Sequence, residues 1–199
     1  MQVQALTLGP LDTNTYLVID EKANECLIID PADAAQTIAD EILAQNLTPI
    51  AMIATHGHYD HIMAAGELQL NFDLPFMIHK RDEFLVKELN QRASRWLKRS
   101  VKLQPPKITS FLKDGQTIEL GEITLRVLHT PGHTPGGICL VDEKDKVVFT
   151  GDTLFADAVG RTDLPYSSTA DLSASLKKLK KSCQDFRGYP GHGREFIVA

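Results

Sequence analysis

The chain has 199 residues, of which 43% are hydrophobic and 24% charged, and its formal net charge is -5. This length suits one compact domain with a substantial core, and this composition excludes wholesale disorder. The negative charge argues against nucleic acid as the principal partner, and no apolar run approaches the ~18 residues that a transmembrane helix needs.

The first predicted elements are two short strands. Residues 15–19 and 26–29 are apolar or β-branched runs separated by a polar turn, so they predict a hairpin with one buried face. In residues 33–46 the apolar positions recur at helical spacing and predict an amphipathic helix. The fully apolar run 50–54 then predicts a strand buried inside a sheet.

The middle of the chain has a more helical pattern. We predict a helix over residues 62–70, a strand over 75–79, and a long helix from Asp82 to about Val101. On that long helix, Trp96 shares an apolar stripe with the leucines and is expected to pack inward. Pro105-Pro106 ends the helical stretch.

The last part of the chain returns to short strands. They are predicted over residues 116–120, 123–128, 137–141 and 147–150, and a final helix over 169–182. We find no internal repeat, low-complexity segment or Ser/Gly linker. The pattern predicts one mixed α/β domain spanning residues 1–199, with much pairing between strands that are neighbours in sequence.

The N-terminus and the cysteines predict where the protein works. The first residues, MQVQALTLGPLD, lack the basic start and the apolar stretch of a signal peptide. The three cysteines, Cys26, Cys139 and Cys183, are odd in number and form no CxxC pair, which argues against a disulfide framework. We therefore expect a cytoplasmic protein, with Cys139 buried in a strand.

The strongest chemical signal is His56-x-His58-x-Asp60-His61. Alternate residues of an extended segment point the same way, so His56 and His58 can reach one metal ion. The turn that follows offers Asp60 and His61 to another ion. The alternative interpretation is a polar surface loop, but four potential ligands within six residues, directly after an apolar run, favour a metal site.

A second histidine motif follows the strand predicted at residues 123–128, in His129-Thr130-Pro131-Gly132-His133. Thr130 must stay extended before Pro131, and Gly132 permits a sharp turn that can aim His133 inward. We predict that His133 is a metal ligand. His129 is expected to hold another ligand or to be structural, and His79 is not expected to bind metal.

Two further motifs complete the set. The hydrophobic strand ending in Phe149-Thr150-Gly151 delivers Asp152 to the rim of a sheet, where the carboxylate can bridge two cations; the alternative is an ordinary turn residue. Near the C-terminus, His192 lies in a turn between Gly191 and Gly193. This last motif is weak by itself and gains its meaning from the other three.

The charges of these residues fit two divalent ions. Five neutral imidazoles and two carboxylates carry a charge of -2, and two divalent ions carry +4. A hydroxide bridging the ions leaves the site with a net charge of about +1. Such a site lowers the pKa of its bound water to roughly 7. Nitrogen and carboxylate ligands without a thiolate suit zinc, iron or manganese, and we expect zinc.

The motif series THGHYDH, HTPGHTPGG, FTGDTLF and YPGHG resembles that of the metallo-β-lactamase superfamily, and most of all that of compact bacterial glyoxalase II proteins. The resemblance covers nearly the whole chain. It implies a four-layer αββα sandwich with the metals at one edge of its two sheets. It also implies that His56, His58 and His133 hold the first ion, that Asp60, His61 and His192 hold the second, and that Asp152 bridges them.

The chain departs from full-length glyoxalase II at three points. It stops seven residues after His192, so the helical C-terminal extension that helps to bind glutathione is not expected. Where family members often have a lysine, this chain has Arg161, and Arg194 replaces an expected tyrosine. Arginine can hold a carboxylate bidentately, so Arg161 is our candidate for binding an anionic substrate; the alternative is a salt bridge with Asp163.

The leading functional hypothesis is hydrolysis of a small anionic thioester of the S-2-hydroxyacylglutathione type. A hydroxide bridging the ions would attack the carbonyl carbon, and Asp60 would orient it as well as bind metal. A thiolate leaves readily because the pKa of a thiol is only ~8.5.

Two other activities remain open. Persulfide dioxygenases share these motifs and use one iron, which here would be held by His56, His133 and Asp152; the complete second set of ligands favours the hydrolase. A phosphodiesterase or nuclease is the other candidate, because a basic stretch surrounds Trp96. We interpret that stretch as a solvated helix face, although it could form a lip that attracts anionic substrates; its members are Arg92, Arg95, Lys98, Arg99 and Lys102.

Overall fold

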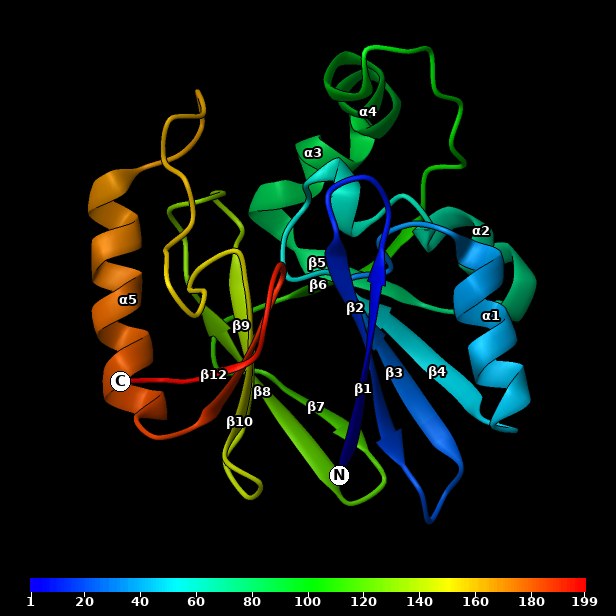
Figure 1. Ribbon diagram of the computed structural model, residues 1–199, viewed down its shortest axis with the longest axis horizontal. Helices are drawn as coiled ribbons and strands as arrows, with labels where there is room; N and C mark the ends of the chain where they lie inside the picture. The colour runs from blue at the N-terminus through cyan, green and yellow to red at the C-terminus, as the bar shows by residue number, and fades with distance from the viewer.

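Two six-stranded β-sheets form the centre of the computed structural model, which describes residues 1–199 (Figure 1). The first sheet has the order β1-β2-β3-β4-β5-β6, with β1 (Gln2–Leu8), β2 (Thr13–Asp20), β3 (Glu25–Ile29), β4 (Thr48–Ile53), β5 (Phe76–His79) and β6 (Ile108–Leu112). The second has the order β12-β11-β10-β9-β8-β7, with β7 (Thr117–Leu120), β8 (Ile123–His129), β9 (Ile138–Asp142), β10 (Val147–Gly151), β11 (Arg187–Pro190) and β12 (Phe196–Ile197).

Helices cover the outer faces of both sheets (Figure 1). They are α1 (Ala35–Ala44), α2 (Ala65–Phe72), α3 (Glu83–Lys87), α4 (Leu89–Leu97) and α5 (Thr169–Cys183), with short 3₁₀ turns at Tyr59–His61 and Lys80–Asp82. None of the helices combines the length and the apolar character required to cross a bilayer.

The alternation of side chains along the central strands produces the layers. In β2, Tyr16 and Val18 point into the core shared by the two sheets, while Leu17 and Ile19 pack on the other face, against the helix layer. Every residue of β2 is buried, as a strand covered on both faces requires. Fully burying one such aliphatic side chain contributes about 1.5–3 kcal/mol.

The second sheet repeats this arrangement. Phe149 of β10 enters the core between the sheets, whereas its neighbour Val148 packs with Leu179 and Cys183 of α5. The order is therefore helices, sheet, sheet, helix. The predicted four-layer αββα sandwich is confirmed.

The long helix predicted from Asp82 to Val101 is wrong. The chain forms two short helices, α3 and α4, separated at Glu88 (φ -96°, ψ 11°), and α4 ends where Lys98 adopts a left-handed conformation (φ 51°). The following segment turns back along α4, because the Asn90 amide bonds both backbone groups of Leu103 and the Ser94 hydroxyl accepts from Val101 N–H. The spacing of apolar residues does not reveal these polar contacts, so it could not predict where the helix ends.

The inward packing predicted for Trp96 is also wrong. Leu89 and Ala93 are buried in the core as expected, but Trp96 is 51% exposed. Four strands were not predicted from the pattern, namely β1, β6, β11 and β12. The three of them that lie at sheet edges, β1, β6 and β12, are only partly buried, so their sequences lack a clear apolar run.

The sheets bring the functional motifs to one edge. β3 pairs in parallel with β4, and β10 in parallel with β11. The carboxyl ends of each pair therefore meet, and each is followed by a polar side chain: Asp30 after β3, His56 after β4, Asp152 after β10 and His192 after β11. This is the edge at which ligands bind in open α/β sheets.

Asp82 holds two of the motif loops against each other. Its fully buried carboxylate accepts hydrogen bonds from Gly57 N–H (2.9 Å), the Thr134 hydroxyl (2.7 Å) and Gly136 N–H (2.6 Å). Gly57 belongs to the first histidine motif, while Thr134 and Gly136 follow His133 in the second. A single carboxylate thus fixes the distance between the loops that carry His56, His58 and His133.

We expect Asp82→Ala to lower the free energy of unfolding by about 3 kcal/mol, because it leaves buried donors of both loops without an acceptor. Denaturant unfolding measures the change. Asp40→Ala, at an exposed position of α1, is the matched control and should shift stability by less than about 0.5 kcal/mol. Equal stability of the two variants would show that Asp82 does not hold the loops.

Candidate metal centre

The first group of candidate ligands combines three histidines and one carboxylate. One ligand atom each of His56, His58, His133 and Asp152 lies within 4.8 Å of the others. His58 Nδ1 is 3.0 Å from His56 Nε2 and 2.9 Å from His133 Nε2. The extended segment and the loop after β8 therefore bring these side chains together as the sequence predicts.

The second group contains Asp60, His61 and His192, again with one ligand atom each within 4.8 Å of the others. His61 Nε2 lies 3.3 Å from His192 Nε2, and Asp60 Oδ2 lies 3.4 Å from His192 Nε2. Asp60 and His61 come from the 3₁₀ turn after the first motif, while His192 arrives from the end of β11, more than a hundred residues later.

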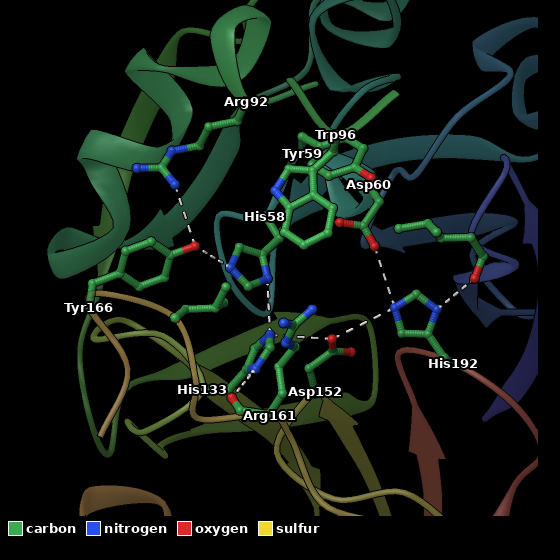
Figure 2. A pocket seen from close by; sticks show the side chains of 12 residues that line it. His58, Tyr59, Asp60, Arg92, Trp96, His133, Asp152, Arg161, Tyr166 and His192 are labelled. Carbon is green, nitrogen blue, oxygen red and sulfur yellow. Dashed lines mark hydrogen bonds and ion pairs between the residues drawn. The ribbon is translucent and has the colours of Figure 1, made fainter. Parts of the chain in front are cut away.

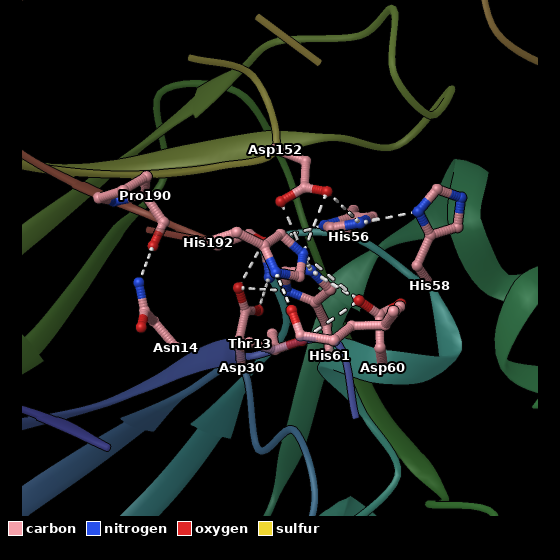
Figure 3. A network of polar contacts seen from close by, with 12 residues as sticks. Thr13, Asn14, Asp30, His56, His58, Asp60, His61, Asp152, Pro190 and His192 are labelled. Carbon is pink, nitrogen blue, oxygen red and sulfur yellow. Dashed lines mark hydrogen bonds and ion pairs between the residues drawn. The ribbon is translucent and has the colours of Figure 1, made fainter. Parts of the chain in front are cut away.

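Asp152 lies between the two groups (Figure 3). Its Oδ2 is 3.4 Å from His133 Nε2 and 3.7 Å from His192 Nε2, and its Oδ1 is 3.5 Å from His61 Nε2. Oδ1 is buried and has no hydrogen-bond partner. Buried carboxylate oxygens are costly without a partner, so this atom fits a cation placed between the groups.

The backbone at Gly191 packs directly against the side chains of Asp152 and His61. A Cβ atom on Gly191 would overlap Asp152 Oδ1 and lie 2.7 Å from His61 Cε1. The chain between β11 and His192 therefore needs a glycine, because any larger residue would fill the space that the ligands face. This close approach explains why a glycine stands directly before His192.

All five histidines are oriented by a partner on the side away from the shared space. The partners are the Thr55 hydroxyl for His56 (3.1 Å), the Tyr166 hydroxyl for His58 (2.8 Å), the Asp30 carboxylate for His61 (3.0 Å), the Arg161 carbonyl for His133 (2.9 Å) and the Leu11 carbonyl for His192 (3.0 Å). The other nitrogen of each ring then faces the space between the candidate ligands. This is the arrangement that metal-binding histidines have in proteins.

The electrostatics differ between the groups. Burial and the neighbouring imidazoles hold the pKa of His56 and His58 well below their ordinary range, so both rings are neutral and offer lone pairs. Burial opposes protonation of His61 as well, but the carboxylates of Asp152, Asp30 and Asp60 outweigh it and raise the pKa of His61 to about 10. The second group therefore favours a positive charge at its centre.

The donor set fits divalent metal ions. Imidazole and carboxylate ligands suit zinc, iron and manganese, and no thiolate is near, since Cys26, Cys139 and Cys183 are all buried in the cores. His79 and His129 stack on each other at 4.1 Å, and His129 Nε2 lies 3.0 Å from the Pro135 carbonyl. His129 therefore supports the second motif loop, and neither ring joins the cluster.

A pocket opens directly above the two groups (Figure 2). Charged and aromatic side chains form its walls together with several of the candidate ligands. Its lining consists of Leu11, His58, Tyr59, Asp60, Arg92, Trp96, His133, Asp152, Arg161, Leu164, Tyr166 and His192.

Arg161 forms the salt bridge that was the alternative interpretation, and its side chain also lies in the pocket wall. It forms a bidentate ion pair with Asp163 (2.7 and 2.6 Å), and it also lines the pocket, where its guanidinium lies 5.5 Å from the centre of the Trp96 ring. Arg194 instead pairs with the exposed Asp157 and is absent from the pocket lining.

Three supporting residues were not recognised as such from the sequence. Asp30 follows β3 as Asp152 follows β10, and this shared position is the signal that could have found it. Asp82 is the first residue of the long helix predicted from the sequence, and in the structure it precedes α3. Tyr166 lies in a loop with no pattern that distinguishes it.

We expect Tyr166→Phe to weaken metal binding about 10-fold or more, because His58 loses the partner that orients it. Competition with a chelator measures the affinity. Tyr189→Phe is the matched control, since the Tyr189 hydroxyl makes no hydrogen bond and its ring stacks on Phe149. Identical affinities in both variants would contradict the role of Tyr166.

Comparison with known proteins gives a consistent result. The family model of the metallo-beta-lactamase superfamily matches residues 8–192. Hydroxyacylglutathione hydrolase GloC of Haemophilus influenzae is 32% identical over 97% of this chain and 91% of its own length.

Solved structures agree with the sequence comparison. BLEG-1, a B3 metallo-beta-lactamase, superposes with a TM-score of 0.90 at 29% identity, covering 99% of this chain and 94% of that one. TTHA1623 in a di-iron-bound form has a TM-score of 0.88 at 35% identity, covering 98% of this chain and 95% of that one. The fold and the histidine and aspartate cluster support divalent metal ions, and the chain belongs to the metallo-β-lactamase superfamily.

Proposed function

We propose that this protein is a binuclear metal-dependent hydrolase that cleaves a small anionic thioester, of the S-2-hydroxyacylglutathione type. The observation that carries the proposal is the position of Asp152, whose two oxygens face both groups of histidines. Similarity to a hydroxyacylglutathione hydrolase supports the choice of substrate.

The metal assignment follows the two groups. His56, His58 and His133 would hold the first ion, Asp60, His61 and His192 the second, and Asp152 would bridge them. Zinc is the proposed metal, with iron the alternative suggested by the di-iron form of TTHA1623. When bound, such a pair of ions supplies an activated water and polarises the carbonyl of the substrate.

The chain's own residues position the reactants. Asp60 Oδ2 lies beside both the second group and the pocket and is held by the Thr13 hydroxyl at 3.3 Å, so it is placed to orient the attacking water. Leu11 and Leu164 give the pocket an apolar wall for the acyl group. Water adds its oxygen to the acyl carbon, the C–S bond breaks, and the thiolate leaves without a strong acid because its pKa is ~8.5.

Arg161 is the proposed anchor for the negative charge of the substrate. Its partner Asp163 is 67% exposed, so a substrate carboxylate can replace this surface ion pair at little cost. The planar guanidinium offers the same bidentate geometry to either carboxylate.

The complete second group favours this proposal over a dioxygenase with one iron. A mononuclear site built from His56, His133 and Asp152 leaves Asp60, His61 and His192 without a function. Here these three side chains converge and are oriented as carefully as the first group.

The test is thiol release from a panel of thioesters, beginning with lactoyl-glutathione, by the metal-loaded protein. Asp152→Asn should lose bound metal and about a thousandfold in turnover, because a metal pair supplies several kcal/mol of charge stabilisation. Asp157→Asn, at an exposed ion pair, is the matched control and should retain both.

Two results would contradict the proposal. One is full turnover by metal-depleted Asp152→Asn protein. The other is consumption of oxygen with glutathione persulfide, together with no cleavage of any thioester.

A further inference from the structure

A second groove lies beside the pocket over the metal centre. Four residues, Arg92, Trp96, Leu164 and Tyr166, line both, so the two spaces are neighbours that share one wall. Tyr166 connects them directly. Its hydroxyl is 2.8 Å from His58 Nε2 and 3.4 Å from Arg92 Nη1, so the groove begins one side chain away from a candidate metal ligand (Figure 2).

The groove is positively charged although the chain as a whole carries -5. Arg92, Arg95 and Lys98 line it together with a single acidic residue, Glu88, which leaves an excess of two positive charges. Glu88 is already engaged, since it pairs with Arg92 at 2.6 Å. Arg95 and Lys98 have neither an ion-pair partner nor a side-chain hydrogen bond, so their charges are available to a ligand.

An exposed aromatic ring lies between the pocket and these free cations. Trp96 is 51% exposed, and Arg161 from the pocket side lies over its ring. Trp96 lies in the last turn of α4, and Lys98 follows it in a left-handed conformation that ends the helix. Both side chains line the groove.

We propose that this groove, which we call the α4 groove, binds the anionic end of the thiol carrier while the acyl group lies over the metal centre. The ligand class is a thiol carrier with carboxylate or phosphate groups at its far end. The proposal rests on the proposed thioester hydrolysis for the identity of the ligand. It adds a substrate-binding site on α4, made of Arg95, Lys98 and Trp96.

The experiment uses the fluorescence of Trp96, which is the only tryptophan of the chain. Metal-loaded protein is titrated with three thioethers that cannot be hydrolysed: S-methylglutathione, which carries carboxylates, S-methyl-coenzyme A, which carries phosphates, and neutral S-methyl-N-acetylcysteamine. We expect the anionic compounds to change the emission and to bind more weakly at high salt. The tighter of the two identifies the carrier.

Arg95→Gln/Lys98→Asn removes the two free charges, and asparagine tolerates the left-handed conformation at position 98. Binding of the anionic thioethers should weaken about tenfold, as expected for two exposed charge pairs, with no change for the neutral compound. Lys177→Gln/Lys181→Gln removes the same charge from α5, on the far side of the second sheet, and should bind like wild type (Figure 1).

Equal binding of charged and neutral thioethers, or an unchanged affinity in the Arg95→Gln/Lys98→Asn variant, would overturn the assignment. Tighter binding of an oligouridylate, lost in the same variant, would overturn it in favour of nucleic-acid phosphate. Charge-dependent binding without cleavage of any thioester would refute the proposed function and retain the α4 groove as a site. Cleavage without charge-dependent binding would refute the groove alone.

Discussion

Five imidazole nitrogens and the oxygens of two aspartates face one another across a few ångströms at the edge of the two sheets. In this arrangement the buried Oδ1 of Asp152 has no hydrogen-bond partner, which is costly for a carboxylate oxygen. The imidazole and carboxylate donors fit divalent metal ions, which would satisfy this oxygen. The surrounding structure holds these side chains in position.

The candidate ligands are held in position by residues that lie behind them and do not face the space between the two groups. Asp30 bonds the backbone and hydroxyl of Thr55 and also His61, so one carboxylate links the end of β4 to the second group. Asp82 performs the same task between the two motif loops. Each of these carboxylates is almost fully buried, and each is satisfied by several donors. Catalytic geometry in this fold thus relies on buried carboxylates behind the ligands as much as on the ligands themselves.

Most of the candidate ligands were predictable from local sequence, whereas the His192 motif gained its meaning only from the other three. An apolar run followed by His-x-His-x-Asp-His needs no tertiary information, and the strand ending in Asp152 has the same character. The layers were predictable for a similar reason, since alternation in strands such as β2 shows burial on both faces. The helix break at Glu88 and the exposure of Trp96 were not, because the contacts of Asn90 and Ser94 with the returning chain are tertiary. Tyr166 was missed for the same reason: its partner His58 lies 108 positions away.

The proposal that one folded chain holds two divalent ions through Asp152 can be tested by counting the bound ions with native mass spectrometry. We expect two ions per wild-type chain after loading with zinc or iron, and cooperative loss of both from Asp152→Asn, because the carboxylate faces both groups. A wild-type chain that holds one ion at saturation, or an Asp152→Asn chain that retains two, would contradict it.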